Sequence, residues 1–288
     1  MKIIYGRGWP TRLAVAGTIC AGLLVAAFSP ANAAEAGGAI TDPVVIAQLL
    51  HHDNHAMGSQ VRKHEPGTDQ PMAIQSGPDL SVQAVVYGID VSSYQGNVNW
   101  AYWWGQGKRF AYVKATEGTT YRNPYFAQQY NGSYNVGMIR GAYHFALPNV
   151  SSGATQATYF ATNGGGWSRD GKTLPGTLDI EYNPYGATCY GLSAGSMVSW
   201  IKSFSDTYHL RTGRWPVIYT TTNWWSTCTG NLGDFSSTSP LWIARYASTP
   251  GTLPYHWSVY TFWQYSSSPI DQDLFNGAYD RLQALALG

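Results

Sequence analysis

The sequence predicts an α/β fold, a TIM-like barrel formed by residues 85–288. Two observations support this prediction. First, eight short apolar runs of the kind that buried parallel strands require lie at 85–91, 109–115, 138–146, 174–180, 216–221, 241–245, 259–265 and, more weakly, 270–274. Second, helical patterns separate the early runs, whereas the last three leave little room for helices, which indicates a barrel with a degenerate second half. A doubly wound open sheet is the alternative.

Residues 1–33 carry the pattern of a secretory signal peptide. Basic residues near the start precede an apolar run at 13–28, and Ala31-Asn32-Ala33 forms a small-residue cleavage motif. The apolar run is too short and too rich in Ala and Gly for a membrane span. The protein is therefore expected to be secreted and extracellular, in a compartment that permits disulfides.

Residues 34–84 differ in composition from the rest of the chain. They hold four of the 7 histidines, and a loose stretch rich in Gly, Pro, Asp and Gln covers 65–80. A short helix is expected around 43–50. The histidines, His51, His52, His55 and His64, match the spacing of no closed metal site. We interpret 34–84 as a largely flexible prosegment outside the fold, with the mature protein beginning near 82–87.

Two helices between the predicted strands have recognisable ends. Asn123 followed by Pro124 indicates a helix start, and Gly137 ends that helix. A longer helix begins near Ser193. Their buried faces are marked by Phe126, Tyr130 and Tyr134 in the first helix and by Met197, Ile201, Phe204 and Tyr208 in the second.

Composition narrows the possible partners. With 17 basic and 16 acidic side chains, the chain offers no electrostatic basis for binding nucleic acid or an anionic surface. Aromatic residues make up 15% of the chain, including 12 Trp and 21 Tyr. Rings with an apolar face and a polar tip suit sugar surfaces, although packing of the barrel accounts for many of them.

The segment Leu174–Asn183 ends on two carboxylates, Asp179 and Glu181. On a strand, residues i and i+2 point the same way, so both acids project to one side at its C-terminal end. Their crowding is expected to raise the pKa of one of them, which leaves one proton donor and one charged group. Such pairs serve glycoside hydrolysis, although an isolated D-x-E is more often two solvated acids.

Further polar residues fall at the ends of other predicted strands, where barrels gather their functional groups. Glu117 is the acid most expected to pair instead with a buried Lys or Arg. The set comprises Asp90, Glu117, Tyr143, His144, Tyr219, Arg245, Gln264 and Asp271.

Cys189 and Cys228 are the only cysteines that remain after removal of residues 1–33. They lie in the loops after the fourth and fifth strands, which a barrel brings side by side. We therefore expect a disulfide between them.

The sequence implies neither a cofactor nor a metal. No glycine-rich phosphate loop follows a strand, and no serine nucleophile elbow occurs. The histidines of the barrel region, His144, His209 and His256, are scattered without ligand spacing.

Four motifs resemble glycoside hydrolase family 25, the secreted lysozymes of the Chalaropsis and Streptomyces type. They are DVSSYQG from Asp90, YVKATEGTTYRN at 112–123, the LDIE core at 178–181, and the closing WQY with DQDLFNG. The resemblance covers roughly 87–287. It implies a flattened barrel of eight strands and five helices that hydrolyses the β-1,4 bond between N-acetylmuramic acid and N-acetylglucosamine in peptidoglycan.

The resemblance also implies roles for single residues. Glu181 would be the general acid, Asp179 its partner, and Asp90 and Asp271 orienting acids, with Glu117 structural or supporting. Asp273 stands where relatives often carry Asn, so either it or Asp271 faces the cleft. Supporting contacts with the glycan are expected from Tyr143, Tyr182, Tyr219, Trp242, Arg245, Trp263 and Gln264.

Two other functions remain open from the sequence. A chitinase-like barrel or endo-N-acetylglucosaminidase also uses D-x-E, but the longer acidic run usual in chitinases is missing because Thr177 precedes Leu178. A glycan-binding barrel without catalysis would not need the crowded pair of acids. The expected partner is the glycan strand of peptidoglycan, bound by a monomer that associates with neither nucleic acid nor, after export, a membrane.

Overall fold

A computed structural model describes residues 55–65 and 85–288. The predicted helix at 43–50 and the proposed signal peptide lie outside these residues. The strands are β1 Val86–Val91, β2 Phe110–Glu117, β3 Tyr121–Arg122, β4 Ile139–Phe145, β5 Thr177–Asp179, β6 Val217–Thr220, β7 Leu241–Ala244, β8 Phe262–Ser266 and β9 Gln272–Phe275. The helices are α2 Val61–His64, α3 Trp100–Gly105, α4 Phe126–Asn135, α5 Gly153–Thr162, α6 Ala194–Thr212, α7 Thr222–Thr229 and α8 Tyr279–Leu287, with a 3-10 turn, η1, at Ser93–Gln95.

The strands close into a barrel, as the sequence predicts. Their order is β1-β9-β8-β7-β6-β5-β4-β2, and β1 returns to pair with β2. The two-residue strand β3 pairs only with β2 and lies outside the closure. The eight barrel strands confirm the TIM-like prediction, and this closure excludes the doubly wound open sheet.

One strand of the barrel runs against the others. β9 is antiparallel to both β1 and β8, whereas the other barrel pairings are parallel. The reason is the short connection between β8 and β9, residues 267–271, because a parallel neighbour would need a crossover of a dozen or more residues. This is the degenerate second half that the sequence indicates.

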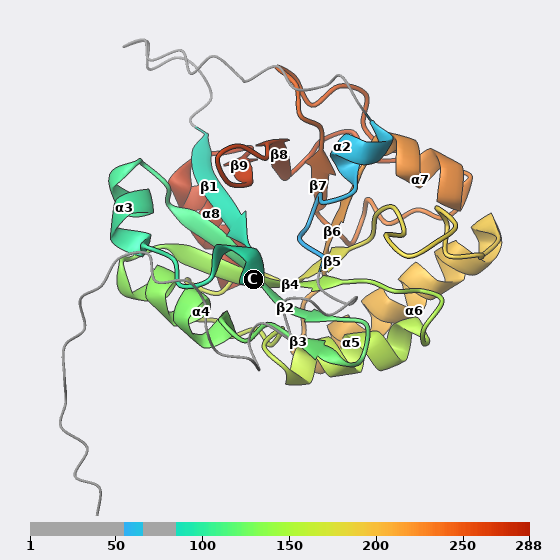
Figure 1. Cartoon of the computed structure of the whole chain (residues 1–288), viewed down its shortest axis with the longest axis horizontal. Helices are drawn as coiled ribbons and strands as arrows, with labels where there is room; N and C mark the ends of the chain where they lie inside the picture. The colour runs from blue at the N-terminus through green and yellow to red at the C-terminus, as the bar shows by residue number, and fades with distance from the viewer. Residues whose placement is uncertain (1–54, 66–84) are drawn as a thin grey trace, which may run out of the picture. The chain divides into compact units, whose positions relative to one another are not determined.

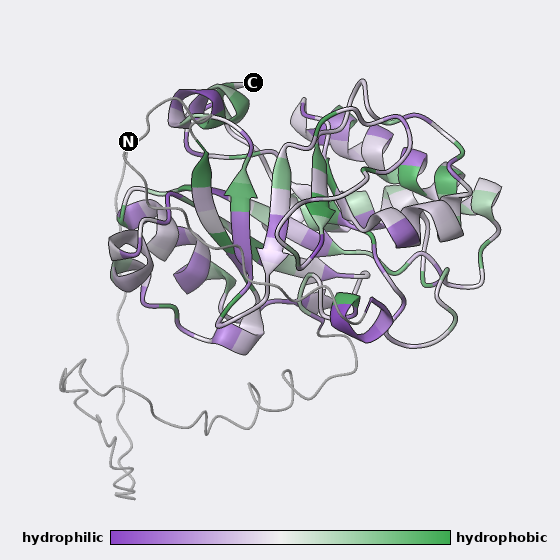
Figure 2. Cartoon of the chain, turned by 90° about the horizontal axis from the view of Figure 1, so that it is seen from above, coloured by the Kyte–Doolittle hydropathy of each residue, from purple (hydrophilic) through white to green (hydrophobic). Residues whose placement is uncertain are grey.

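Side chains fill the inside of the barrel in layers. Phe110, Tyr112 and Trp242 are completely buried there. Helix α8 closes the end at which the parallel strands begin, since its Leu282 belongs to the same cluster. Figure 2 shows α8, with the C terminus, beside one end of the strands. The opposite end, where the parallel strands finish, is left for the functional groups.

Helices α5 and α6 cover the outside of the barrel. Helix α6 begins after Ser193, whose side chain accepts a hydrogen bond from the Ser196 backbone, and ends at Gly213 in the left-handed conformation (φ 74°). The predicted buried face of α6 is confirmed, because Met197, Ile201, Phe204 and Tyr208 are all buried. Within the described residues, no helix has both the length and the apolarity to cross a membrane.

Helix α4 differs in detail from the prediction. It begins at Phe126 rather than beside Asn123, because the Asn123 side chain accepts a hydrogen bond from the Tyr125 backbone (2.9 Å) and forms a turn instead. Its completely buried residues are Gln129 and Ser133, whereas Tyr134 is exposed. Gln129 donates to the backbone carbonyl oxygens of Ser92 and Gly96. These buried carbonyl groups need a hydrogen-bond donor, so a polar side chain suits this position better than an apolar one.

Residues 55–65 correct one prediction outright. The interpretation that all of 34–84 lies outside the fold is wrong for this segment, because Met57 and Val61 are buried within the interior cluster of the barrel. Figure 1 shows the segment in blue, with α2 near α7.

Candidate active site

Asp179 and Glu181 lie at the C-terminal end of β5. Asp179 is the last residue of the strand and Glu181 follows two residues later; both side chains are completely buried. The residues between and before them, Ile180 and Leu178, pack in the outer hydrophobic cluster. Alternation therefore directs both carboxyl groups into the barrel, as the sequence predicts.

Three more acids come from the adjoining strands β1 and β9 and from the residue just before β9. Asp90 is completely buried, and Gly88 opposes Asp273 across the β1–β9 pair. Because Asp271 is two residues from Asp273, both face the interior, with Asp273 completely buried and Asp271 half-buried at the rim. The sequence left open whether Asp271 or Asp273 faces the cleft. In the structure both face the interior, with Asp271 at the mouth of the barrel and Asp273 deeper inside it.

Burial dominates the electrostatics of these acids. It raises the pKa of Glu181 to about 8, with the negative charge of Asp271 acting in the same direction and backbone hydrogen bonds from Gly58 and Gln60 opposing it. Burial, followed by the charge of Glu181, raises the pKa of Asp179 well above its ordinary value. Crowding was the expected cause, but burial is the larger one. Burial therefore favours retention of a proton by this pair of carboxyl groups at neutral pH.

Glu117 belongs to a separate, buried ion pair. Its carboxylate binds the ammonium group of Lys114, and both side chains are inaccessible to solvent. Burial alone would raise the pKa of Glu117, but the Lys114 charge and hydrogen bonds from His55 lower it below the ordinary value. The interpretation of Glu117 as a partner of a buried cation is confirmed. Lys114 itself was not singled out, although a lysine within an apolar strand marks such a cation.

A hydrogen-bonded chain holds Asp90 in place. Gln264 donates its side-chain N–H to Asp90 (2.7 Å), and its side-chain oxygen accepts from the hydroxyls of Tyr219 (2.7 Å) and Tyr246 (2.9 Å). Tyr246 was not among the predicted residues. Its position could have been found from alternation, since it follows the inward-facing Trp242 and Ala244 at intervals of two.

Three residues predicted as glycan contacts lie in three different places. Trp263 belongs to the outer cluster, where its indole donates to the Arg245 carbonyl (2.8 Å), because alternation turns it away from the side that Gln264 faces. Trp242 is completely buried in the interior cluster against Tyr112. Arg245 donates to the Thr249 carbonyl (2.9 Å) and lines a pocket together with Glu65 and Asn223.

Tyr143 and Tyr182 both contact residues 55–65. The Tyr143 hydroxyl accepts from the Met57 backbone (3.2 Å), and the Tyr182 hydroxyl donates to Glu65 (2.6 Å). These two tyrosines therefore line the side of the barrel where the acids lie.

We expect Tyr219→Phe to reduce turnover with little loss of stability. The change removes one bond to Gln264, whose oxygen keeps its bond to Tyr246, so the stability cost is about 1 kcal/mol and the melting temperature falls by roughly 2–4 °C. The rate of hydrolysis is expected to fall because Gln264, with one bond fewer, holds Asp90 less firmly. Kinetics and thermal denaturation of Tyr208→Phe provide the control, since that buried hydroxyl bonds the Gly165 carbonyl outside the barrel (2.7 Å). Equal rate losses in the two variants would contradict this role.

The predicted disulfide is confirmed. Cys189, in the loop after β5, is bonded to Cys228 in α7, with their Cα atoms 5.2 Å apart. The bond ties together the two connections that follow β5 and β6. It therefore braces the wall of the barrel mouth beside Glu181.

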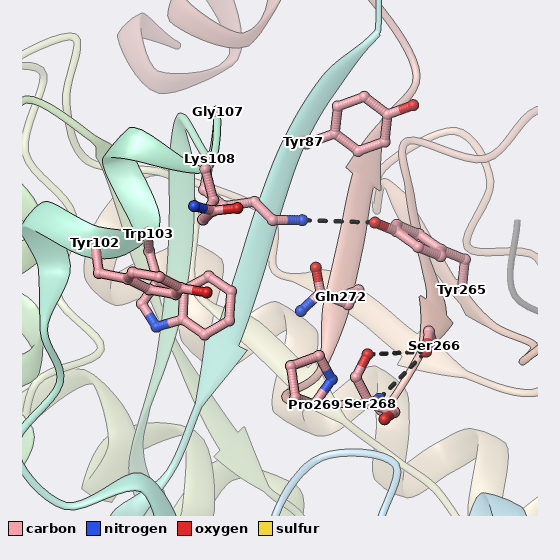
Figure 3. A pocket seen from close by; sticks show the side chains of 11 residues that line it. Tyr87, Tyr102, Trp103, Gly107, Lys108, Tyr265, Ser266, Ser268, Pro269 and Gln272 are labelled. Carbon is pink, nitrogen blue, oxygen red and sulfur yellow. Dashed lines mark hydrogen bonds between the residues drawn. The ribbon is translucent and has the colours of Figure 1, made fainter. Parts of the chain in front are cut away.

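An aromatic pocket lies apart from these acids. It has a volume of about 410 Å³ and lies between α3 and the strands β1, β8 and β9 (Figure 3). Tyr87 and Tyr265 line it, and Lys108 reaches the Tyr265 hydroxyl at 3.5 Å. The acids of the barrel interior are not among its lining residues. Within the described parts of the chain, no group of three or more His, Cys, Asp or Glu side chains could hold a metal ion.

Comparisons with known proteins agree on one family. The model of "Glycosyl hydrolases family 25" matches residues 89–274. Lysozyme M1 of Streptomyces globisporus is 49% identical over 233 residues, covering 76% of this chain and 79% of that protein. The N,O-diacetylmuramidase of a Chalaropsis species is 52% identical over 210 residues, covering 70% of this chain and all (100%) of that protein. The solved structure of a muramidase from Acremonium alcalophilum is 59% identical and has a TM-score of 0.69, over 70% of this chain and 99% of that one.

Proposed function

This chain belongs to glycosyl hydrolase family 25, and on that basis we propose that it is a lysozyme that cleaves the β-1,4 bond between N-acetylmuramic acid and N-acetylglucosamine in peptidoglycan. The observation that carries the proposal is the pair of buried carboxyl groups, Asp179 and Glu181, that project into the barrel from the end of β5. Relatives named lysozyme and N,O-diacetylmuramidase, at 49% and 52% identity, support the substrate class.

We assign the proton transfer to Glu181. With residues 55–65 over it, burial raises the pKa of Glu181 to about 8. A sugar bound at the same position would also exclude water and keep the carboxyl group protonated, so that it can protonate the leaving glycosidic oxygen. Asp179 lies on the same side of the sugar, because both acids come from one strand. It either holds negative charge or orients the 2-acetamido group of the substrate. Both of its carboxylate oxygens are buried without a hydrogen-bond partner among the described residues, which leaves them available for that contact.

The opposite wall of the site comes from β1 and β9. Asp90, held by Gln264, and Asp271 face the pair from there. Because β1 and β9 lie across the barrel from β5, a sugar bound between these walls would have Asp90 and Asp271 on the side away from Asp179 and Glu181. They are therefore suited to orient the substrate or a water molecule on the far face.

The test of this function uses the products. Purified protein freed of residues 1–84 is incubated with defined peptidoglycan, and the new reducing end is identified by mass spectrometry after borohydride reduction. A lysozyme releases N-acetylmuramic acid at the reducing end. Release of N-acetylglucosamine would favour an endo-N-acetylglucosaminidase, cleavage of chitin but not bacterial walls would favour a chitinase-like enzyme, and binding without cleavage would favour a glycan-binding barrel.

We also propose that the protein is secreted and that the mature enzyme begins near residues 82–87. The support is the signal-peptide pattern of residues 1–33 and the start of the first barrel strand at Val86. N-terminal sequencing of the protein from culture supernatant should find this start, and size-exclusion chromatography should find a monomer. A fully active supernatant protein that begins at Ala34 would contradict the proposed start.

A further inference from the structure

Residues 55–65 lie on the groups proposed to do the chemistry. The backbone N–H of Gly58 donates to the Glu181 carboxyl group at 2.6 Å, and the Gly58 carbonyl accepts from Tyr246 at 3.2 Å. The neighbouring Met57 N–H donates to the Tyr143 hydroxyl at 3.2 Å. A peptide backbone therefore occupies the position in which a sugar would meet Glu181.

The fit is closest at Gly58. This residue has a φ of 74°, a conformation that L side chains rarely adopt. A Cβ atom added to it would overlap the hydroxyls of Tyr246 and Tyr219 and the side-chain oxygen of Gln264. Only glycine therefore lets the segment reach this depth.

Both ends of the segment are also held. At the start, the His55 N–H donates to Glu117 (2.8 Å) and the His55 carbonyl accepts from Lys114. At the end, the His64 ring stacks on Tyr182 with centroids 4.3 Å apart and planes within 1°, and Glu65 accepts from the Tyr182 hydroxyl (2.6 Å).

Apolar burial and charge add to these bonds. Met57 and Val61 are completely or almost completely buried inside the barrel (1% and 0% exposed). Arg62 lies 5.8 Å from the centre of the Tyr246 ring, and its positive charge lowers the pKa of Asp271 against the effect of burial. The segment thus places a positive charge near Asp271 and fills the barrel mouth with buried side chains, as an inhibitor would.

We propose that residues 55–65 are an intramolecular inhibitor that occupies the active site and keeps the secreted enzyme latent until the chain between residues 65 and 86 is cut. The proposal rests on the proposed function. An endopeptidase would supply the cut by adding water across one peptide bond. While it is attached, the segment binds at an effective concentration on the order of millimolar. Once cut, it is diluted into the medium and the site opens.

The test compares the full chain before and after a cut at a protease site engineered into 66–84. Two full-chain variants accompany it: Gly58→Ala, which introduces the overlap, and Ser59→Ala, a control at an exposed neighbour. Strain and steric overlap should raise the open population in Gly58→Ala on the order of 10-fold or more. The expected peptidoglycan hydrolysis is therefore slow in the intact chain and in Ser59→Ala, and at least tenfold faster in the cut chain and in Gly58→Ala.

Equal rates in the intact and cut chains, or in Gly58→Ala and Ser59→Ala, would overturn the proposal. Hydrogen exchange at the amide of residue 58 supplies a readout that does not require activity. That amide should be protected in the intact wild-type chain and in Ser59→Ala and should exchange on the order of 10-fold faster or more in Gly58→Ala. Unprotected exchange in the wild type would also overturn the proposal. If the cut chain hydrolyses no peptidoglycan, the proposed function fails, and the exchange result still decides whether the segment occupies the site.

Discussion

Glu181→Gln will lower the rate of peptidoglycan hydrolysis by a factor on the order of 10²–10⁴, the usual contribution of a general acid. Glutamine has nearly the shape of glutamic acid, but its amide has no acidic proton to give to the glycosidic oxygen. Its side-chain oxygen can still accept the Gly58 N–H, so the segment 55–65 stays in place in the uncut chain. The rate is therefore measured after cleavage within 66–84, with thermal denaturation as the check that folding is unchanged.

A substrate with a good leaving group separates the roles of the two acids. Such a substrate needs little protonation, so Glu181→Gln should recover much of its activity on it, while Asp179→Asn should not. Asp179→Asn keeps the volume of the side chain and removes its charge, which makes it the matched comparison. The reverse result, with Asp179→Asn recovered and Glu181→Gln equally impaired on both substrates, would show that the roles are exchanged.

Lys114→Met will destabilise the full chain by about 3–5 kcal/mol, the usual cost of removing one partner of a buried ion pair. Both members of the pair are inaccessible to solvent, so Glu117 would be left as a buried charge beside His55 and Tyr185. Protonation of Glu117 can relieve part of this cost, so the loss should shrink in acid. Chemical denaturation of the full chain at neutral and at acid pH measures this loss of stability.

Lys202→Met is the control for this prediction. Lys202 donates to Asp206 at 2.6 Å within α6, but both side chains are largely exposed (68% and 48%). Its removal should change stability by about 0–1 kcal/mol. The double variant Lys114→Met with Glu117→Gln should regain part of the stability lost by Lys114→Met. A loss in Lys114→Met no larger than that in Lys202→Met would contradict the buried pair.

Local geometry explains what the sequence could predict. Alternation along a strand is a property of a few residues, so the shared direction of Asp179 and Glu181 followed from their spacing alone. The ends of α6 followed from Ser193 and Gly213 in the same way. The disulfide between Cys189 and Cys228 needed only the additional inference of a barrel.

The positions of the aromatic residues could be assigned only from the closed barrel. Trp263 and Gln264 are neighbours in β8, but one packs outside and the other faces the acids. Trp242 and Tyr246 both face inward, yet Trp242 packs against Tyr112 in the buried interior whereas Tyr246 reaches the mouth and bonds the Gly58 carbonyl. Depth within the barrel depends on how all the strands are staggered, which no single strand encodes.

The sequence by itself determined the barrel, the pair of acids and the family, because these depend on short patterns that are complete within one segment. Only the tertiary structure decided that burial sets the acidity of Glu181 and that residues 55–65 cover it. The bond between Gly58 and Glu181 joins residues 123 positions apart. Residues 55–65 carry no pattern that points to such a partner, since their fit depends on a surface assembled from several strands when the barrel closes.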